Sequence, residues 1–360
     1  MWPWVRTMSS DDRTVPFSDC PIPIIDTKQI LLGHGSGGKL TSQLIERLFL
    51  PAFRNPALEA LDDQAILEIG GERIAFSTDS YVVTPIFFPG GDIGELAVNG
   101  TINDLAMSGA IPRALSLAFI LEEGFEIGEL ERIVESIRAS AARAGVDIVT
   151  GDTKVVGRGS GDKIFINTTG IGIIPKGIAL SSSRVRPGDD ILLSGSIGDH
   201  GIAILSQREG LEFDGEVRSD TAALHELVAA MLRAWPDIHA MRDPTRGGVA
   251  ATLVEIASRQ KVGIEVDEMR IPIRDVVRGA CEILGLDPLL VANEGKLIAF
   301  VPPEGSEKVL SAMRAHPLGP EAAIIGRVTT ERPGFVMMHT SIRGQRIIDL
   351  PFGEVLPRIC

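Results

Sequence analysis

The sequence predicts an α+β protein: two α/β sandwich domains, each with helices on one face of a mostly antiparallel or mixed sheet, and then a flexible C-terminal tail. With 360 residues, of which 44% are hydrophobic, the chain is long enough for two ordinary cores. Both halves combine strand patterns with amphipathic helix patterns, which is typical of this fold class. Between the halves, residues 176–188 are rich in Pro, Gly and Ser, as in an interdomain linker.

The first predicted domain covers residues 28–175. It begins with apolar residues at helical spacing after a glycine-rich stretch, and Pro51 ends that helix. Gly70 and Gly71 join two strand patterns as in a hairpin. The predicted elements are helices at 40–50, 93–107 and 129–143 and strands at 65–69, 73–78, 113–121, 146–150 and 163–174.

The second predicted domain covers residues 189–350 and is not a plain sequence repeat of the first. Its helix patterns are amphipathic, and short apolar runs between them read as strands. The predicted elements are helices at 199–208, 221–234, 246–259, 273–284 and 304–315 and strands at 190–194, 263–267, 296–302, 322–328, 334–339 and 345–349.

The two ends of the chain have a different composition. Residues 1–27 are rich in Pro and Ser, which predicts a disordered extension. In residues 351–360, Pro351 and Pro357 exclude a helix, so we expect an extended, flexible tail that spans up to ~33 Å. Its last residue is Cys360. A thiol on such a tether can carry a chemical group between two places, or it is an incidental cysteine at a frayed end.

Composition limits the function. The net charge of −13 argues against binding to nucleic acid or to an anionic membrane surface. No apolar run approaches the ~18 residues of a membrane span, and the start of the chain lacks the apolar core of a signal peptide. Cys20, Cys281 and Cys360 are too far apart in sequence to suggest a zinc site or a disulfide framework. We therefore expect a cytoplasmic protein.

The stretch Gly33-His-Gly-Ser-Gly-Gly38-Lys39 is the first candidate site. It fits GxGxxG, but the apolar run before it is too short for a dinucleotide-binding strand. It nearly fits the Walker A pattern, but Leu40 stands where a Ser or Thr must follow the lysine. What remains is either an anion cradle of backbone N–H groups beside one cation, or a flexible glycine loop.

Acidic residues beside Gly, Ser and Thr form the second candidate. Such aspartates at strand ends and helix starts suit Mg²⁺, which binds through one or two carboxylates plus phosphate oxygens. Taken singly, each also fits a helix cap or a turn. Glu294, between Asn293 and Gly295, could act as a base or lie in a surface turn. The aspartates concerned are Asp62, Asp63, Asp79, Asp104, Asp152 and Asp243.

Eight short motifs occur in order along residues 33–360: HGSGGK, DDQA, STDS, NDLAMSGA, GDTK, DPTRGG, NEGK and a terminal PRIC. Together they resemble the HypE family, the carbamoyl dehydratases of [NiFe]-hydrogenase maturation. That family is part of the PurM-like superfamily of aminoimidazole ribonucleotide (AIR) synthetase, selenophosphate synthetase and thiamine monophosphate kinase. The glycine loop, the aspartates and DPTRGG mark the superfamily, whereas NEGK and the PRIC end single out HypE.

The resemblance implies a function for the tail. In HypE proteins the terminal cysteine receives a carbamoyl group from the partner HypF, and ATP-dependent dehydration converts this thiocarbamate into a thiocyanate. The cyano group then passes to iron on the HypC–HypD complex. The resemblance also implies a homodimer that pairs through its N-terminal domains, with ATP and Mg²⁺ bound near that interface.

Residue roles follow from the same resemblance. Cys360 is the carrier, with Lys154 to stabilise the phosphorylated oxygen and Glu294 to accept the proton. Arg358, next to the thiol, would favour the thiolate, although the α-carboxylate of Cys360 opposes it. The expected Mg²⁺ ligands are Asp63, Asp104 and Asp243, and the expected nucleotide-binding residues are Gly35, Gly37, Gly38, Lys39, Asp79, Asn103 and Asp152.

Two other functions remain open from the sequence. The chain could be another ATP-dependent member of the superfamily that phosphorylates a small amide or a thiamine-like molecule, with Cys360 incidental. It could also be a scaffold that binds nucleotide without catalysis. Removing residues 351–360 should leave a small-molecule enzyme active, whereas an enzyme that depends on the tail should lose its activity. ATP turnover coupled to a change on Cys360 would exclude the scaffold.

Overall fold

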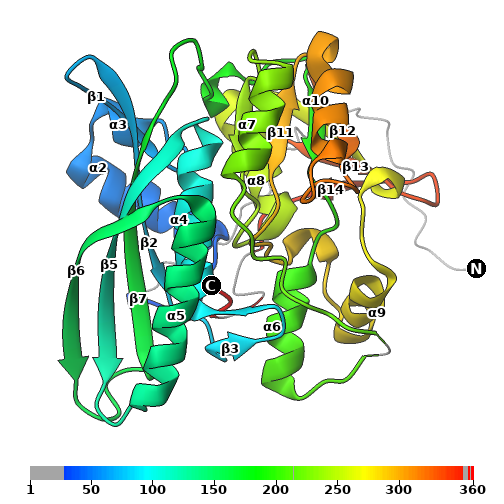
Figure 1. Cartoon of the computed structure of the whole chain (residues 1–360). Helices are drawn as coiled ribbons and strands as arrows, with labels where there is room; N and C mark the ends of the chain where they lie inside the picture. Colours follow the sequence, from blue (N-terminus) through cyan, green and yellow to red (C-terminus); the bar gives the residue numbers. More distant parts are fainter. Residues whose placement is uncertain (1–27, 214, 352–355, 357) are drawn as a thin grey trace, which may run out of the picture. The chain divides into compact units, whose positions relative to one another are not determined.

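The computed structural model describes residues 28–360, except 214, 352–355 and 357. The predicted extension at 1–27, which includes Cys20, and the middle of the predicted tail lie outside the described residues. The helices and strands all belong to one compact unit, Leu32–Cys360. Within it are two large sheets, a small two-stranded sheet and several helices, the α+β arrangement predicted from the sequence (Figure 1).

The first sheet has the order β1-β2-β7-β5-β6 and is antiparallel except for the pair β5–β6. Helices α4 (Ile93–Met107) and α5 (Ile127–Ala144) pack together on one face of it and bury Leu115, Ile164 and Ile166. The strands are β1 (Ala65–Ile69), β2 (Glu72–Tyr81), β5 (Ile111–Glu122), β6 (Asp147–Val156) and β7 (Ile164–Ile173).

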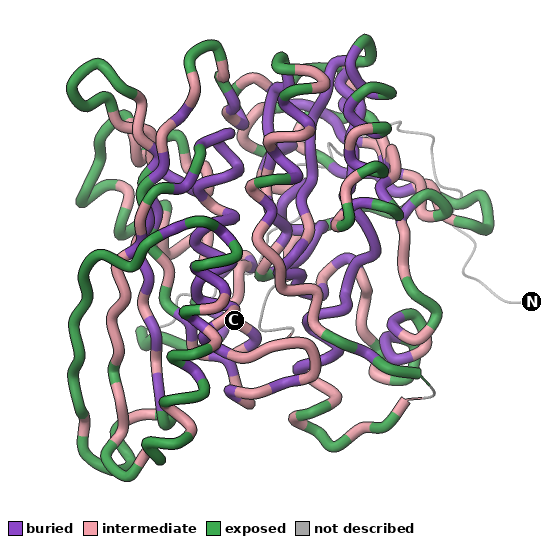
Figure 2. The backbone as a smooth tube through the Cα atoms, viewed as in Figure 1, coloured by how far each residue is buried: buried purple, intermediate pink, exposed green. Residues whose placement is uncertain are grey.

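The opposite face of this sheet, here called the outer face, has no helix of the described residues over it. Cross-strand pairing places Phe76 opposite Ile171, and both side chains are exposed. Strand β6 is exposed along nearly its whole length (Figure 2). Because cross-strand partners share a face, Lys154, paired with Ile120, lies on the outer face too.

The second sheet has the order β14-β13-β10-β12-β8-β11-β9 and is antiparallel except for the pair β10–β13. The strand β9 at one edge was not predicted from the sequence, whereas the strands β13 and β14 at the other edge were, and they pair as a hairpin. The strands are β8 (Asp190–Leu193), β9 (Ala240–Arg242), β10 (Gly263–Asp267), β11 (Ile298–Val301), β12 (Ala323–Thr329), β13 (Val336–His339) and β14 (Gln345–Ile348).

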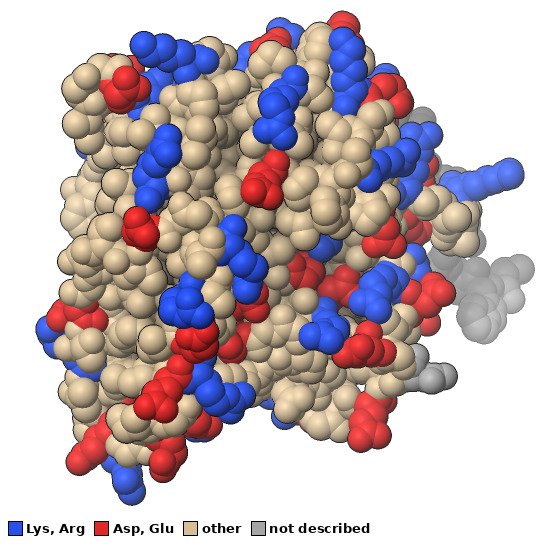
Figure 3. Space-filling model, viewed as in Figure 1, with Lys and Arg blue, Asp and Glu red and all other residues tan. Residues whose placement is uncertain are grey.

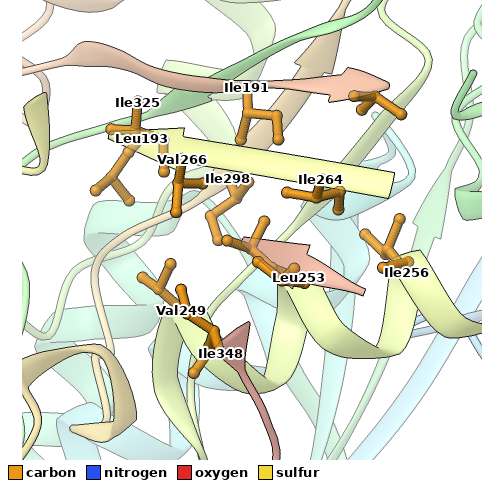
Figure 4. Packing of buried hydrophobic residues seen from close by; sticks show 14 of the residues in the cluster. Ile191, Leu193, Val249, Leu253, Ile256, Ile264, Val266, Ile298, Ile325 and Ile348 are labelled. Carbon is orange, nitrogen blue, oxygen red and sulfur yellow. The ribbon is translucent and has the colours of Figure 1, made fainter. Parts of the chain in front are cut away.

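Helices cover both faces of the second sheet, where the sequence predicted only one. Helix α8 (Gly248–Gln260) packs Val249, Leu253 and Ile256 against one face (Figure 4). Helices α7 (His225–Ala234) and α10 (Pro303–Ala315) pack on the other. The reason is visible in β8 and β11, whose residues are all buried, so neither strand has a solvent face.

The remaining elements are mostly short, and among them α1 and the helical turn that follows it contribute to the cleft described below. They are α1 (Lys39–Leu44), a helical turn at Ile45–Phe49, α2 (Leu50–Phe53), α3 (Pro56–Glu59), β3 (Phe87–Phe88), β4 (Gly91–Asp92), α6 (Asp199–Glu209), α9 (Asp275–Leu284) and single turns at Leu32–Gly35, Ser182–Arg184, Glu268–Arg270 and Pro288–Leu290.

Two properties of the surface bear on function. Acidic and basic side chains are interspersed on the face shown in Figure 3, so the net negative charge is not gathered in one area of that face. Within the described part of the chain, every helix is too short or too polar to cross a bilayer.

Candidate active site

A cleft of about 390 Å³ collects most of the predicted site residues. One wall comes from the first sheet, α4 and the glycine loop, and the other from β9, the loop before α8 and the segment before β11. The end of the tail forms part of the lining. The predicted residues in it are Gly37, Asp63, Asp79, Asp104, Asp243, Glu294 and Cys360.

The first wall is set by the pairing of β2 with α4. Asp63 lies just before β1, and Asp79 lies near the end of β2. Asp104, on the last turn of α4, accepts a 2.6 Å hydrogen bond from the Ser77 hydroxyl of β2. Alternation along a strand puts residues 77, 79 and 81 on the same side, so β2 presents Asp79 and Tyr81 toward α4.

The second wall is the DPTRGG loop, which joins β9 to α8. Gly247 has φ +77°, a conformation that L side chains rarely adopt, and a Cβ there would lie 2.6 Å from that of Ala251. The glycine loop packs against this turn, because a Cβ on Gly37 would lie 2.7 Å from the Arg246 carbonyl oxygen. The Arg246 guanidinium donates a 3.2 Å hydrogen bond to the Gly35 carbonyl.

The aspartates crowd one another in the cleft. Burial raises the pKa of Asp63 to about 6, despite an ion pair of 2.6 Å with Arg242. Burial also raises the pKa of Asp104 and Asp243 well above the usual range, and neighbouring carboxylates, including Asp79, raise both further. Oδ2 of Asp63 is buried without a hydrogen-bond partner. The cleft therefore holds more negative charge than its own cations offset.

The predicted metal ligands are not gathered into a ready coordination shell. Across the residues that the structure describes, no group of three or more His, Cys, Asp or Glu is placed to hold a metal ion. The Asp63 carboxylate is bound to Arg242 and the Asp104 carboxylate to Ser77. The three aspartates share the cleft, but the structure gives them different immediate partners.

The end of the tail is docked in the cleft, a position that the sequence left open. A main-chain oxygen of Cys360 accepts a hydrogen bond of 3.1 Å from Val82 N, and the Arg358 carbonyl accepts one of 3.2 Å from Thr84 N. Ile359 is buried among residues of the core under α4 and α5. The thiol thus reaches the same cleft as the aspartates.

The thiol faces Glu294 and Arg246. Burial raises the pKa of the thiol to about 12, Arg246 acts in the opposite direction, and Glu294 adds to the increase. Glu294 is itself buried rather than in a surface turn, and burial, followed by the charge of Asp243, raises its pKa well above the usual range. The Arg358 guanidinium instead pairs with Asp162 at 2.8 Å, so the cation beside the thiol is Arg246.

Lys154 and Asp152 are not brought to this cleft. The sequence predicted that strand 146–150 would end before them, but β6 continues to Val156 and carries both side chains on its exposed outer face. There they form an ion pair with each other at 2.7 Å. Neither lies beside Cys360 or Glu294 of its own chain.

Three of the predicted nucleotide-binding residues have other partners. The Lys39 ammonium pairs with Asp349 at 2.6 Å. A Cβ on Gly38 would lie 2.7 Å from the Pro351 carbonyl oxygen, so this glycine lets the base of the tail approach. The Asn103 amide is buried and joins α4 to the second half of the chain: it donates to the Ala222 and Glu294 carbonyls and accepts from Leu224 N.

The structure adds cationic residues that the sequence analysis did not single out. Arg242, Arg246 and Arg259 all line the cleft. The sequence contained a signal for two of them, because Arg242 directly precedes the DPTRGG motif and Arg246 is part of it. Arg259 lies a further three turns along α8, and only the packing of that helix against the cleft reveals it.

Sequence and structure comparisons agree with this architecture. The sequence model of the AIR synthase related protein N-terminal domain matches residues 61–174, and that of the C-terminal domain matches residues 186–339. Carbamoyl dehydratase HypE of Azotobacter vinelandii is 59% identical over 327 residues, which is 91% of this chain and 96% of that protein.

Solved structures give the same assignment. Hydrogenase maturation protein HypE in complex with ATP has a TM-score of 0.78 and 53% identity, covering 92% of this chain and 100% of that chain. The HypE chain of a HypE–HypF complex has a TM-score of 0.82 and 47% identity, covering 86% and 99%. The chain described here therefore belongs to the HypE family of carbamoyl dehydratases, within the AIR synthase related, PurM-like superfamily.

Proposed function

We propose that this protein dehydrates an S-carbamoyl group on Cys360 to a thiocyanate with consumption of ATP, as its part in hydrogenase maturation. The carbamoyl oxygen attacks the γ-phosphoryl group of ATP and ADP leaves. The oxygen then departs as phosphate, and the nitrogen loses two protons as the C≡N bond forms. The products are the thiocyanate on Cys360, ADP and phosphate.

The observation that carries the proposal is the position of the Cys360 thiol. It lies in the aspartate-lined cleft, together with Glu294 and Arg246. A carbamoyl group on this sulfur would extend into a space that already contains a carboxyl group and an arginine. This observation does not support a small-molecule kinase, because the reaction of such an enzyme would not require the tail in the cleft.

The cleft fits a Mg²⁺-nucleotide. Asp63 Oδ2 has no hydrogen-bond partner, and burial together with neighbouring carboxylates raises the pKa of Asp104 and Asp243, so a divalent cation would relieve unfavourable charge. Mg²⁺ keeps several water ligands and needs only one or two direct carboxylates, which suits aspartates that do not form a closed shell. When bound, Mg²⁺ would offset the negative charge on the transferring phosphoryl group.

Within this proposal, Glu294 accepts protons from the carbamoyl nitrogen. Its raised pKa brings it toward the operating pH, where a general base is most effective. Arg246, which faces the thiol, would stabilise negative charge on the carbamoyl oxygen. Enclosure of the tail end would keep water away from the phosphorylated intermediate.

We also propose a homodimer that pairs through the outer face of the first sheet. Phe76, Ile171 and Ile120 are apolar and exposed there, and a second copy would remove them from water. Lys154 and Asp152 would lie in that interface. A role of Lys154 beside a carbamoylated cysteine then requires the second copy to supply it.

Two partners complete the proposal. The carbamoyl donor is HypF, in agreement with the solved complex of a HypE relative with HypF. The acceptor of the cyano group is iron on the HypC–HypD complex. Because the docked thiol lies within the cleft and is only partly exposed, we expect loading and unloading to require the tail to leave the cleft. We expect this sequence of reactions to take place in the cytoplasm.

The test is the mass of the C-terminal fragment after incubation with HypF, its carbamoyl donor and Mg²⁺-ATP. We expect Cys360 to gain a carbamoyl group and then to lose one water, the second step only when ATP can be hydrolysed. If ATP is consumed while Cys360 stays unmodified, or if a chain without residues 351–360 keeps full turnover, the substrate is a small molecule and the proposal is wrong.

A further inference from the structure

Helix α6 directs two side chains at the main chain of the tail. His200 Nε2 lies 2.7 Å from the Ile359 carbonyl oxygen. Arg208 Nη2 donates a hydrogen bond of 2.8 Å to the Arg358 carbonyl oxygen. The Arg208 guanidinium also donates to the Thr84 carbonyl, at 2.9 Å from Nε and 2.7 Å from Nη2. It therefore ties the tail to the segment that follows β2.

The orientation of His200 is fixed by its surroundings. The residue has no exposed surface, and its ring meets Phe88 edge-on with 5.6 Å between centroids. Because a carbonyl can only accept, Nε2 carries the proton. Nδ1 then accepts from the Ser219 hydroxyl at 2.8 Å, and Ser219 Oγ in turn accepts from Thr221 N at 3.1 Å. This chain of hydrogen bonds leaves His200 neutral, with one donor aimed at the tail.

The tail end is recognised mainly through its main chain. The main-chain oxygens of its last three residues all have donors: Thr84 N and Arg208 for Arg358, His200 for Ile359, and Val82 N for Cys360. Arg358 has φ +50°, so the chain bends there, and separate donors rather than a strand ladder hold the tail end. Ile359 is buried in the core, and Cys360, which packs against the same core, lines the cleft.

We propose that His200 and Arg208 are positioning residues, which form a docking site for residues 358–360 and thereby hold the Cys360 sulfur in the cleft. Neither side chain contacts the thiol. They act through the Arg358 and Ile359 carbonyls, the main-chain groups directly before Cys360, and fixing these groups limits where the thiol can lie. The catalytic meaning of this docking rests on the proposed function, but the docking itself does not.

The experiment measures how fast Cys360 is alkylated by iodoacetamide in the full chain without nucleotide or partners. Mass spectrometry follows the C-terminal fragment released by cleavage after Glu354, so the other cysteines do not interfere. The docked thiol is only partly exposed and its pKa is raised, so it reacts slowly. His200→Phe keeps a ring but leaves a buried carbonyl unpaired, and we expect the alkylation rate to rise about tenfold.

Matched variants isolate the effect of the hydrogen bond from His200 to the Ile359 carbonyl. In His200→Gln the side-chain amide can still donate to Ile359, and we expect slow alkylation to be largely restored. Arg208→Met keeps the aliphatic stem without the donors and should also speed alkylation. His339→Phe makes the same exchange on β13, where the ring faces Glu265 and Gln345 rather than the tail, and should change nothing.

If His200→Phe and Arg208→Met fold normally and are alkylated at the unchanged rate, the docking proposal is wrong. It is also wrong for His200 if His200→Gln reacts as fast as His200→Phe, since packing rather than the donor would then be responsible. A second readout separates docking from chemistry: the variants should accept the carbamoyl group from HypF at the normal rate but dehydrate it more slowly. If alkylation responds as expected but no carbamoyl group is ever found on Cys360, docking stands and the proposed function fails.

Discussion

The immediate surroundings of Cys360 and Glu294 favour the neutral form of both groups in the free chain. Burial raises the pKa of both, and Glu294 adds to the increase for the thiol. The docked thiol is therefore a poor nucleophile, which argues that it is loaded elsewhere. After loading, the sulfur no longer carries a proton, and Glu294 is left facing the group from which protons must be removed.

A Glu294→Gln variant tests this role. We expect it to accept the carbamoyl group normally but to dehydrate it at least about a hundredfold more slowly, because a general base contributes factors of that order. Mass spectrometry of the C-terminal fragment measures both steps. Glu265→Gln, on β10 outside the cleft, is the control. Normal dehydration by Glu294→Gln would remove this residue from the mechanism.

The pH dependence of dehydration gives a second test at this scale. Glu294 must be ionised to accept a proton, and its pKa is raised, so the rate should fall as the pH drops through that raised pKa. The acidic limb of the profile is thus expected well above the ordinary range of a glutamic acid. Single-turnover rates on the carbamoylated chain would measure it, and a limb at the ordinary glutamic acid pKa would contradict the assignment.

At the scale of elements, α4 joins the two halves of the chain. It packs on the first sheet with one side and, through Ala106 and Met107, against residues of α7 and the second sheet with the other. Asn103 lies within this contact, and its amide satisfies three main-chain groups of the second half. Its position argues for a role in holding the cleft walls together rather than in binding nucleotide.

Replacing Asn103 by Leu tests that role. Three buried main-chain groups would lose their partner, and we expect a loss of about 2–4 kcal/mol in the free energy of unfolding. Urea denaturation measures it. Asn55→Ala, which removes a cap from the exposed helix α3, should cost only about 1 kcal/mol. An Asn103→Leu chain with unchanged stability but weakened ATP binding would restore the nucleotide-binding role.

Local patterns predicted much of the fold, because most elements are long enough to show their period. Helix 93–107 and strand 263–267 have the predicted bounds. The site was harder, because the sequence does not show how far a strand continues or which face a residue occupies. Lys154 was expected at a strand end, but β6 extends to Val156 and turns it to the outer face. His200 and Arg246 contact segments that are distant in sequence, and a local sequence pattern does not predict such contacts.

At the scale of the whole molecule, the outer face of the first sheet is where a second copy would bind. Ile171→Lys would place a charge in the middle of this apolar face, and we expect it to convert the dimer into a monomer. Sedimentation equilibrium measures this change. Ile283→Lys, on the exposed side of α9, is the matched control and should leave the mass unchanged. A dimer that tolerates Ile171→Lys would have to pair through another surface.

The crowded aspartates also predict how stability depends on pH and Mg²⁺. The pKa of Asp63 is raised from 3.8 to about 6, so its carboxyl contributes stability at low pH that is lost as the pH rises through about 6. The pKa of Asp104 and that of Asp243 are raised as well and act in the same direction. The free chain should therefore lose stability as these carboxylates ionise together.

Mg²⁺ binds the ionised form, so the increase in Tm that it produces should be larger near pH 8 than near pH 5. Thermal unfolding with and without Mg²⁺ at the two pH values measures this, and Asp104→Asn should reduce the difference. An equal or larger effect of Mg²⁺ at the lower pH would mean that the cation binds elsewhere. The charge of the crowded carboxylates would then have to be offset by other groups, such as the arginines that already line the cleft.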